Sequence, residues 1–336
     1  MWGIDFFSMR SIVFNNKPTI IGTSSVAGPK ESNGSIGKFF ETKLETDMCG
    51  EKTFEKAETK ILYTAIKSAI KNSNKDEEEI DAIISGDLLD QIIASTFATR
   101  NFSCGYLGVY NACASFAETL VLGSTFIDGG YMKNVVCGTS SHFSSAERQY
   151  RYPLELGSTR PPQSQWTVTG AGALVLSNSG QGPKITCATV GRIIDYGVID
   201  VNNMGAAMAP AACETILTHF RELNLCPDDY DLIVTGDLGT LGSRILKDLL
   251  WEKGYNIEKQ HVDCGELVYN ICEQEYQGGS GAGCSSLVFC SYLCERLRQN
   301  KIKKMLLVST GALLSSLSSQ QGESIPGIAH AVGVER

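Results

Sequence analysis

The sequence predicts an α/β protein of five layers, helix–sheet–helix–sheet–helix, because it contains the same strand-and-helix unit twice. The first copy reads IDAIISGDLLD (80–90), YLGVYNACASFAETL (106–120) and KNVVCGTSS (133–141). The second copy reads YDLIVTGDLGT (230–240), GGSGAGCSSLVFCSYL (278–293) and KMLLVSTGA (304–312). Strands that alternate with helices pair in parallel through right-handed crossovers, so each copy predicts one sheet.

The spacing between the copies indicates a duplication whose halves are related by a pseudo-twofold axis. Asp87 and Asp237 lie 150 positions apart, and Cys113 and Cys284 lie 171 positions apart, as do the lysines that open the third segments. We predict two halves, each of order βαβαβαββ, that span residues 1–195 and 196–336.

The first half opens with its clearest helix, over 53–72, where apolar residues recur every three or four positions. The remaining elements of this half are predicted in order as a strand at 80–85, a helix near 91–101, a buried strand at 106–110, a helix at 113–128, a strand at 134–139, a polar loop over 140–165, and strands at 167–177 and 184–194 that close the half.

The second half repeats this order, and its first helix has Pro210 in the first turn. Its elements are predicted as a helix at 210–223, a strand at 231–235, a helix at 243–253, a strand at 258–263, a helix at 284–298, a strand at 304–309 and a closing segment near 325–335. The helices at 113–128 and 284–298 begin with few charges, as expected for helices covered on most sides. We therefore place these two helices in the central layer.

Composition describes an ordinary globular protein of 336 residues and excludes several functions. The net charge of −8 argues against general nucleic-acid binding, which leaves a basic footprint. Twelve cysteines occur singly and without a CxxC pair, so we expect free thiols in a reducing compartment. The N-terminal WGIDFFSMRSIVF is interrupted by Asp5 and Arg10, and we expect neither a signal peptide nor a transmembrane segment.

Cys113 is the leading candidate for chemistry. It follows Asn111 and Ala112 at the end of a predicted strand, on a turn into a helix, where backbone N–H groups and the helix dipole favour a thiolate or a bound anion. The alternative is an inert buried thiol. The duplication and the turn favour a site, and we interpret Cys284, its counterpart, as a packing residue.

The other candidates are histidines, arginines and one aspartate. His142, His261 and His330 fall at predicted strand ends or in a segment of small residues, whereas His219 is expected on a helix surface. The loop 144–162 combines Arg148, Arg151 and Arg160 with tyrosines, which suits a flat anionic ligand, although a dimer contact or a solvated loop explains it equally well.

The two aspartates in the strand–Gly–Asp–Leu turns are predicted to be turn and capping residues. We keep Asp87 as a site candidate because it belongs to the same half as Cys113.

The stretch NACASFAE after an apolar strand, inside a duplicated βαβ unit, resembles the thiolase and ketoacyl-synthase superfamily. The resemblance implies the thiolase-like five-layer fold and a nucleophilic cysteine at Cys113. Dimers are common in that superfamily, which makes a homodimer an expectation for this chain.

Longer motifs resemble one family within that superfamily, a family of spore proteins from endospore-forming bacteria. They are GTSSVAGPKE (22–31), SGDLLDQ (85–91), SSHFSSAERQYRYP (140–153), ATVGRIIDYG (188–197), MGAAMAPAA (204–212), DYDLIVTGDL (229–238) and ESIPGIAH (323–330). The resemblance implies a protein at the inner membrane of the forespore, held there by membrane proteins of the same sporulation operon. It also implies a role in the uptake of pyridine-2,6-dicarboxylic acid (dipicolinic acid), free or as its calcium chelate.

The residues favour binding over catalysis. Condensing enzymes of the superfamily need two further groups from the second half, namely two histidines, histidine with asparagine, or histidine with a second cysteine. His261 can match one histidine, but GGSGAGCSS contains no partner and the GHP motif is absent. We therefore predict a non-catalytic site for dipicolinate, with no resident cofactor or metal, whose walls include Cys113, Asp87, His142, Arg148, Arg151, His261 and His330.

Two alternatives stay open. Cys113 can act as the nucleophile of an acyltransferase or condensing enzyme, with His261 as its partner. The protein can also serve mainly as a scaffold for its membrane partners.

Overall fold

The computed structural model describes residues 9–150, 160–270 and 276–336, and in these residues twelve strands form one continuous ladder. Its first part contains β5, β4, β6, β8 and β2 side by side, with β8 antiparallel to both neighbours. These strands are β2 (Thr19–Ala27), β4 (Ala82–Gly86), β5 (Gly105–Gly108), β6 (Asn134–Ser141) and β8 (Gly170–Ser177).

The second part of the ladder repeats the first. Here β11, β10, β13, β14 and β9 lie side by side, and β14 is antiparallel to both neighbours. These strands are β9 (Lys184–Thr189), β10 (Leu232–Thr235), β11 (His261–Asp263), β13 (Lys304–Ala312) and β14 (Gly327–Glu335). The two parts meet only where Thr19 of β2 pairs with Lys184 of β9, so they are two sheets.

Short strands complete the ladder and one separate pair. β1 (Ser11–Val13) adds to β9, and β3 (Thr42–Lys43) adds to β2. β7 (Trp166–Thr167) and β12 (Gly279–Ser280) pair with each other across the two halves.

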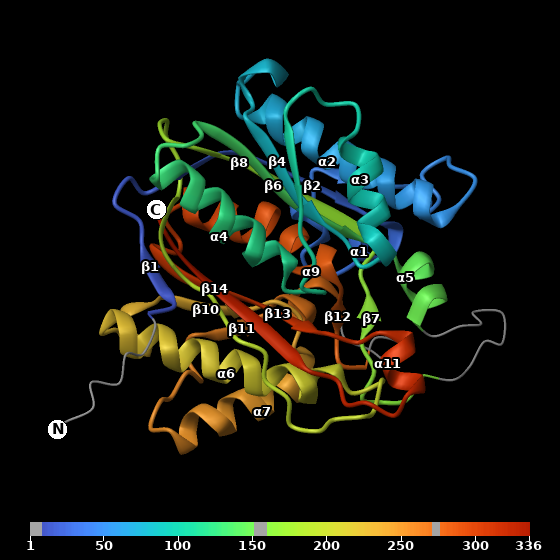
Figure 1. Cartoon of the computed structure of the whole chain (residues 1–336), viewed down its shortest axis with the longest axis vertical. Coiled ribbons are helices and arrows are strands. Elements are labelled where there is room, and N and C mark those ends of the chain that lie inside the picture. The colour runs from blue at the N-terminus through green and yellow to red at the C-terminus, as the bar shows by residue number, and fades with distance from the viewer. Residues whose placement is uncertain (1–8, 151–159, 271–275) are drawn as a thin grey trace.

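Helices form three layers around these sheets, which confirms the predicted five-layer thiolase-like architecture (Figure 1). α2 (Phe54–Asn72) and α3 (Ile93–Thr99) cover the outer face of the first sheet, and α6 (Met204–Leu223) and α7 (Gly239–Glu252) cover that of the second. The central layer contains α4 and a second helix that runs through a π-helical turn: α4 (Ser115–Asp128), α9 (Ala282–Val288), η6 (Phe289–Leu293) and α10 (Cys294–Arg298). α4 contacts strands of both sheets, as the central position requires.

The remaining helices are short. They are α1 (Pro29–Ser32), η1 (Gly37–Phe39), η2 (Glu77–Glu79), η3 (Asp90–Ile92), α5 (Phe143–Tyr150), η5 (Pro227–Asp229), α8 (Cys264–Val268) and α11 (Ser316–Gln320). α5 lies in the stretch that we predicted to be a loop.

The assignment of β9 corrects one prediction. We expected the strand at 184–194 to close the first half, but β9 pairs along its length with β14 and belongs to the second sheet. The strand that fills the corresponding place in the first sheet is β2, which the sequence analysis did not identify. Apart from β1, which adds to β9, the strands of the first sheet end with β8 and those of the second sheet begin with β9, before residue 195.

Two further element predictions differ in detail. The strand predicted as buried at 106–110 is β5, which lies at the edge of the sheet with its four residues exposed. Pro210 lies inside α6 rather than in its first turn, because the helix begins at Met204.

The register of the strands refines the duplication. Val135 pairs with Ala82 in the first sheet and Met305 pairs with Leu232 in the second, so the partners are offset by 150 and 170 positions. The strand after the central helix is therefore shifted by one residue relative to an alignment that matches the cysteines. The same repeat appears in a side-chain contact, since Asp81 and Asp231 each accept two backbone N–H groups at the start of the next strand.

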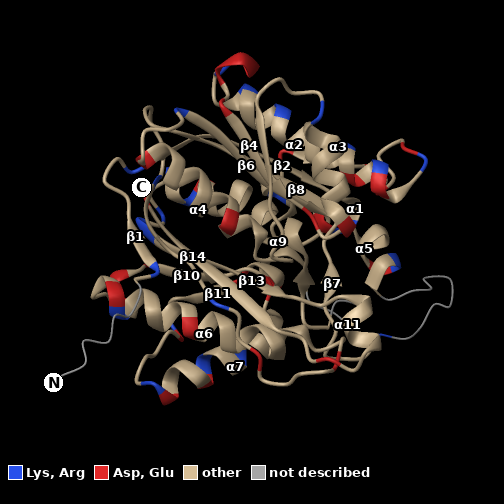
Figure 2. Cartoon of the chain, in the orientation of Figure 1, with Lys and Arg blue, Asp and Glu red and all other residues tan. Residues whose placement is uncertain are grey.

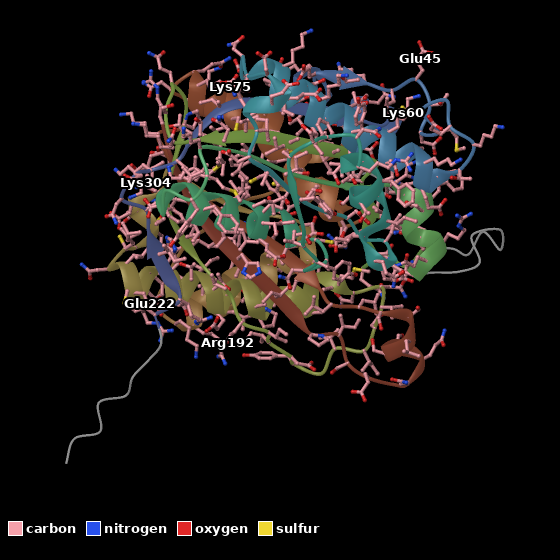
Figure 3. All side chains as sticks on the ribbon, turned by 45° about the horizontal axis from the view of Figure 1, so that its top comes forward. Glu45, Lys60, Lys75, Arg192, Glu222 and Lys304 are labelled. Atoms are coloured by element: carbon pink, nitrogen blue, oxygen red, sulfur yellow. The ribbon has the colours of Figure 1, made fainter. Side chains whose placement is uncertain are left out.

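Charged side chains lie mainly on the outer helices and loops, and little charge lies on the central helices (Figure 2). Lys60, Lys75 and Lys304 illustrate this distribution at the periphery (Figure 3). Along 9–150, 160–270 and 276–336, no helix combines the length and apolar character needed to span a membrane.

Candidate functional site

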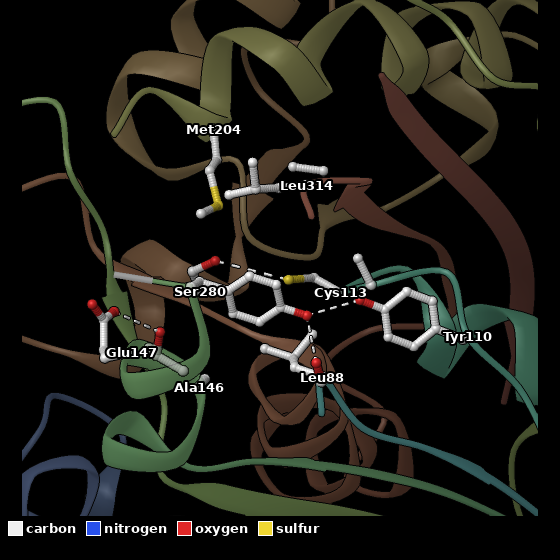
Figure 4. A pocket seen from close by; sticks show the side chains of 12 residues that line it. Leu88, Tyr110, Cys113, Ala146, Glu147, Met204, Ser280 and Leu314 are labelled. Carbon is white, nitrogen blue, oxygen red and sulfur yellow. Dashed lines mark hydrogen bonds between the residues drawn. The ribbon is translucent and has the colours of Figure 1, made fainter. Parts of the chain in front are cut away.

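A pocket lies between the two halves, beside the N-terminal end of α4 (Figure 4). It holds about 450 Å³ of empty space, counting the part open to solvent. Its walls are Leu88, Tyr110, Ala112, Cys113, Ala146, Glu147, Tyr150, Thr167, Met204, Ser280, Ala312 and Leu314. Both halves thus supply walls.

Cys113 sits on a tight turn immediately before α4. Ala112 has a φ of 49°, in the left-handed region that non-glycine residues seldom adopt. Ser115 fixes this turn, because its Oγ accepts the Asn111 N–H at 2.9 Å and donates to the Ala112 carbonyl at 2.8 Å. The thiol therefore projects beside the positive end of a 14-residue helix.

The turn packs closely against the second half. A Cβ on Gly311 of β13 would lie 2.4 Å from the Asn111 carbonyl oxygen, so only glycine allows this approach. The cysteine is held in place by both halves.

The group that faces Cys113 from the second half is a serine backed by an aspartate. The Cys113 Sγ lies 3.9 Å from the Ser280 Oγ, which donates to Asp237 Oδ2 at 2.8 Å. The Gly281 N–H also donates to Oδ2, at 3.0 Å, and the Thr310 hydroxyl donates to Oδ1 at 2.8 Å. Asp237 thus joins three elements of the second half behind the thiol.

A second buried carboxyl group, Asp263, holds the turn that carries Asp237. Asp263 accepts the backbone N–H groups of Leu238 at 2.9 Å and Gly239 at 3.1 Å. It also accepts the Thr235 hydroxyl at 2.6 Å. Hydrogen bonds therefore hold both the Asp237 carboxylate and the two residues that follow it, where α7 begins.

The environment of Cys113 favours the neutral thiol over the thiolate. Burial raises the pKa of the Cys113 thiol well above its ordinary value, and the neighbouring Asp237 carboxyl raises it further. Burial also raises the pKa of Asp237. The thiolate is the reactive form of cysteine, and both effects disfavour it at Cys113.

Two tyrosines also line the pocket. The hydroxyl groups of Tyr110 and Tyr150 lie 2.9 Å apart, and Tyr150 donates to the Leu88 carbonyl at 2.5 Å. Tyr110 therefore donates to Tyr150, and the chain of hydrogen bonds links α5 to the turn before Cys113 (Figure 4).

The charged part of the wall is already paired. Glu147 accepts the Thr167 hydroxyl at 3.1 Å and forms an ion pair with Arg160 at 3.2 Å. The guanidinium of Arg160 also lies over the ring of Trp166. Among the described lining residues, Glu147 is the one with a formal charge, and none is histidine, asparagine, lysine or arginine.

Of the predicted site residues that the structure describes, only Cys113 lies in the wall of this pocket. Asp87 is fully buried elsewhere, where Oδ1 accepts the Leu89 N–H at 2.8 Å and Oδ2 accepts the Ser95 N–H at 2.7 Å. It therefore caps a turn. Burial raises the pKa of the nearby Glu58 to about 8, and the Asp87 carboxyl adds to this shift.

His142 and Arg148 are also outside the pocket wall. The His142 ring is buried between the Ser144 N–H and the Asp47 carbonyl, and burial lowers its pKa. Arg148 pairs with Glu55 on α2, at the surface. Arg151 lies outside the described residues.

The remaining histidines support the scaffold. His261 contacts the Thr235 hydroxyl at 2.9 Å, and burial lowers its pKa to about 3. His330 lies behind the cysteine turn, 3.3 Å from the Asn111 side-chain nitrogen, and accepts the Gly191 N–H. The expectation that His219 is a surface residue is wrong, because it is fully buried between Thr189 and Tyr230.

Sequence reasoning missed Asp237 and Ser280 as site residues and gave no separate role to the tyrosines. The sequence contained a signal for Asp237, because it is the second-half equivalent of Asp87, 150 positions later. A cleft between the two halves takes one wall from each, so the second-half aspartate can face Cys113. Within the described ranges, no group of three His, Cys, Asp or Glu side chains is placed to hold a metal ion.

Comparison with known proteins places the sequence in context. The family model described as stage V sporulation protein AD matches residues 8–335. The curated stage V sporulation protein AD of Bacillus subtilis is 42% identical over 324 residues, which cover 96% of this chain and 96% of that protein.

Solved structures with the same fold are more distant in sequence. A 3-oxoacyl-[acyl-carrier-protein] synthase III from Aquifex aeolicus superimposes with a TM-score of 0.58 at 17% identity and covers 95% of this chain and 100% of its own. Cerulenin-bound OleA from Xanthomonas campestris superimposes with a TM-score of 0.62 at 13% identity, over 97% of this chain and 100% of its own. At these identities the likeness establishes the thiolase-like fold alone.

Proposed function

Because the chain belongs to the stage V sporulation protein AD family, we propose that it acts in sporulation as a non-catalytic binding protein for dipicolinic acid. In this proposal the pocket beside Cys113 holds the acid, free or as its calcium chelate, during uptake into the forespore. The protein lies at the inner membrane through membrane proteins of the same operon.

The observation that carries the non-catalytic part is the environment of the thiol. A condensing enzyme needs an imidazole or amide beside its cysteine to bind an oxyanion and move a proton. Here Ser280 and Asp237 occupy that side, and both burial and Asp237 raise the pKa of Cys113.

The lining supports a flat aromatic ligand with polar ends. Leu88, Met204 and Leu314 provide apolar contact for the faces of such a ring, and tyrosine, serine and threonine hydroxyls make other parts of the wall polar. The N-terminal end of α4 favours negative charge. Since the wall also carries Glu147, the calcium chelate, whose net charge is less negative, is compatible with the same pocket.

Calorimetry with purified protein and dipicolinate tests this placement. Ala146→Phe inserts a ring into the pocket from α5, and we expect it to weaken binding by about tenfold or more. Arg148→Ala on the same helix is the matched control, because Arg148 points to Glu55 and should leave the affinity unchanged. Wild-type affinity in Ala146→Phe, with its fold intact, would place the ligand elsewhere.

The alternative is an acyltransferase that uses Cys113 as its nucleophile. It predicts a covalent mass gain on Cys113 after incubation with an acyl-CoA, seen by peptide mass spectrometry. Our proposal predicts no such adduct.

We also propose that the protein forms a homodimer through the edge of the first sheet. β5 is an edge strand with exposed Tyr106 and Leu107, and the exposed Ile93 and Phe97 of α3 lie in the same region. Exposed apolar edge strands are suited to pairing with a second copy. Leu107→Lys should shift the mass in solution from dimer to monomer, whereas Val13→Lys on β1 should not; a monomeric wild-type protein would contradict the proposal.

A further inference from the structure

Tyr150 occupies a position between the two halves that the proposed function does not explain. Its ring packs against the small cluster around the thiol, which includes Leu88, Ala112 and Cys113. The same ring also packs against the core of the second half, which includes Leu314. The side chain therefore crosses the pocket from one half to the other.

Hydrogen bonds hold this ring in place. The Tyr150 hydroxyl donates to the Leu88 carbonyl at 2.5 Å and accepts from Tyr110. The helix that carries it is anchored as well, because the Ser145 hydroxyl donates to the buried Glu58 at 2.7 Å and Glu147 pairs with Arg160. A ring fixed at its tip and at its base acts as a wall.

The consequence appears at the thiol. Cys113 lines the pocket, yet it is only 6% exposed. The Tyr150 ring lines the same pocket as the sulfur and packs against both clusters, so it reduces the space in which an extended chain could lie beside the thiol. A small ligand can instead lie against that ring.

We propose that Tyr150 is the specificity-determining residue of the pocket, which admits small flat ligands and excludes extended acyl chains from Cys113. This role rests on the geometry of the pocket and not on the identity of the ligand.

The test compares the alkylation rates of Cys113 by a small reagent, iodoacetamide, and by a maleimide that carries an octyl chain. Peptide mass spectrometry resolves the sites, and the exposed Cys226 serves as the internal reference. In Tyr150→Ala we expect the octyl reagent to react about tenfold faster than in wild type and iodoacetamide only about twofold faster. Tyr150→Phe, which loses only the hydrogen bonds, should raise the octyl rate by about threefold.

Tyr131→Ala is the control for loss of a tyrosine at a distant, exposed position. An equal rise for both reagents would overturn the proposal, because a change in thiol pKa affects both alike. An unchanged octyl rate would overturn it too. If Tyr150→Ala also exposes the buried Cys284, that variant has lost its fold, and the same size comparison on Tyr150→Phe decides. Because no dipicolinate is used, this result stands or fails separately from the proposed function.

Discussion

The two halves contain the same Gly–Asp–Leu turn, but its aspartate makes different contacts in each half. Asp87 follows β4 and Asp237 follows β10, 150 residues later, in equivalent Gly–Asp–Leu turns. Asp87 is buried and accepts backbone N–H groups of its own half. Asp237 accepts the hydroxyl of Ser280, which lies next to the thiol of the first half. Residues of the second half, such as Ser280, therefore complete the wall of the pocket that holds Cys113.

The outer helices show how the two turns diverged. By the same offset of 150 residues, Glu58 of α2 corresponds to Met208 of α6. Glu58 lies beside Asp87, and each ion disfavours the other in a buried site. The second half has an uncharged methionine there, and Asp237 instead bonds to groups at the cleft.

The cysteines diverged in a parallel way. Cys113 precedes α4 on a turn with positive φ at Ala112, and it lines the pocket. Cys284 lies inside α9, fully buried, with its thiol 3.6 Å from the Gly236 carbonyl. Only the first is placed to meet a ligand.

The largest expected difference between the two turns follows from replacing each aspartate with asparagine. Asp237→Asn removes a negative charge beside the thiol, so the pKa of Cys113 should fall and its alkylation at pH 7.5 should accelerate by about tenfold for each pKa unit. Asp87→Asn should leave that rate unchanged. Equal rates in the two variants, measured by peptide mass spectrometry, would show that Asp237 does not control the thiol.

The pH dependence of Glu58→Gln tests the first-half turn. The folded pKa of Glu58 is about 8, raised from 4.5, so its contribution to stability is fully present below pH 4.5 and is lost as pH rises toward 8. The glutamine variant escapes this loss. It should gain about 2 kcal/mol in free energy of unfolding relative to wild type at pH 7.5, and much less at pH 5, by urea denaturation. A gain of the same size at both pH values would contradict the shift.

A smaller difference, in the free energy of unfolding, is expected between alanine variants of the two cysteines. Cys284→Ala leaves a cavity in the central layer and should lower the free energy of unfolding by about 1 kcal/mol. Cys113→Ala borders a pocket that already exists and should cost less than about 0.5 kcal/mol. Equal losses in urea unfolding would mean that Cys113 is a packing residue as well.

The sequence allowed the layers and the cysteine turn to be predicted because both leave local patterns. The charge-poor starts of 113–128 and 284–298 place these helices in the centre, and the small residues around Cys113 indicate the turn. No local pattern shows that β2 belongs to the first sheet and β9 to the second, since either strand is compatible with the same position in either sheet. The stretch at β5 reads as a buried strand, yet its position at the sheet edge exposes it.

The histidines show the same limit for the site. His142 follows the end of β6, as predicted, whereas His261 begins β11 and does not end its strand. In either position a side chain can face the cleft, a loop or the core. Which one it faces depends on contacts between distant segments, such as His142 with Asp47. The arginine loop was equally ambiguous, and Arg148 pairs at the surface.

The central claim is that the pocket beside Cys113 binds dipicolinate without using the thiol chemically. The most direct measurement is the alkylation of Cys113 by iodoacetamide with and without saturating dipicolinate, with Cys226 as reference. The account predicts that the ligand slows the reaction at Cys113 by about tenfold or more and leaves Cys226 unchanged. Full reactivity of Cys113 in protein that calorimetry shows to be saturated would contradict it.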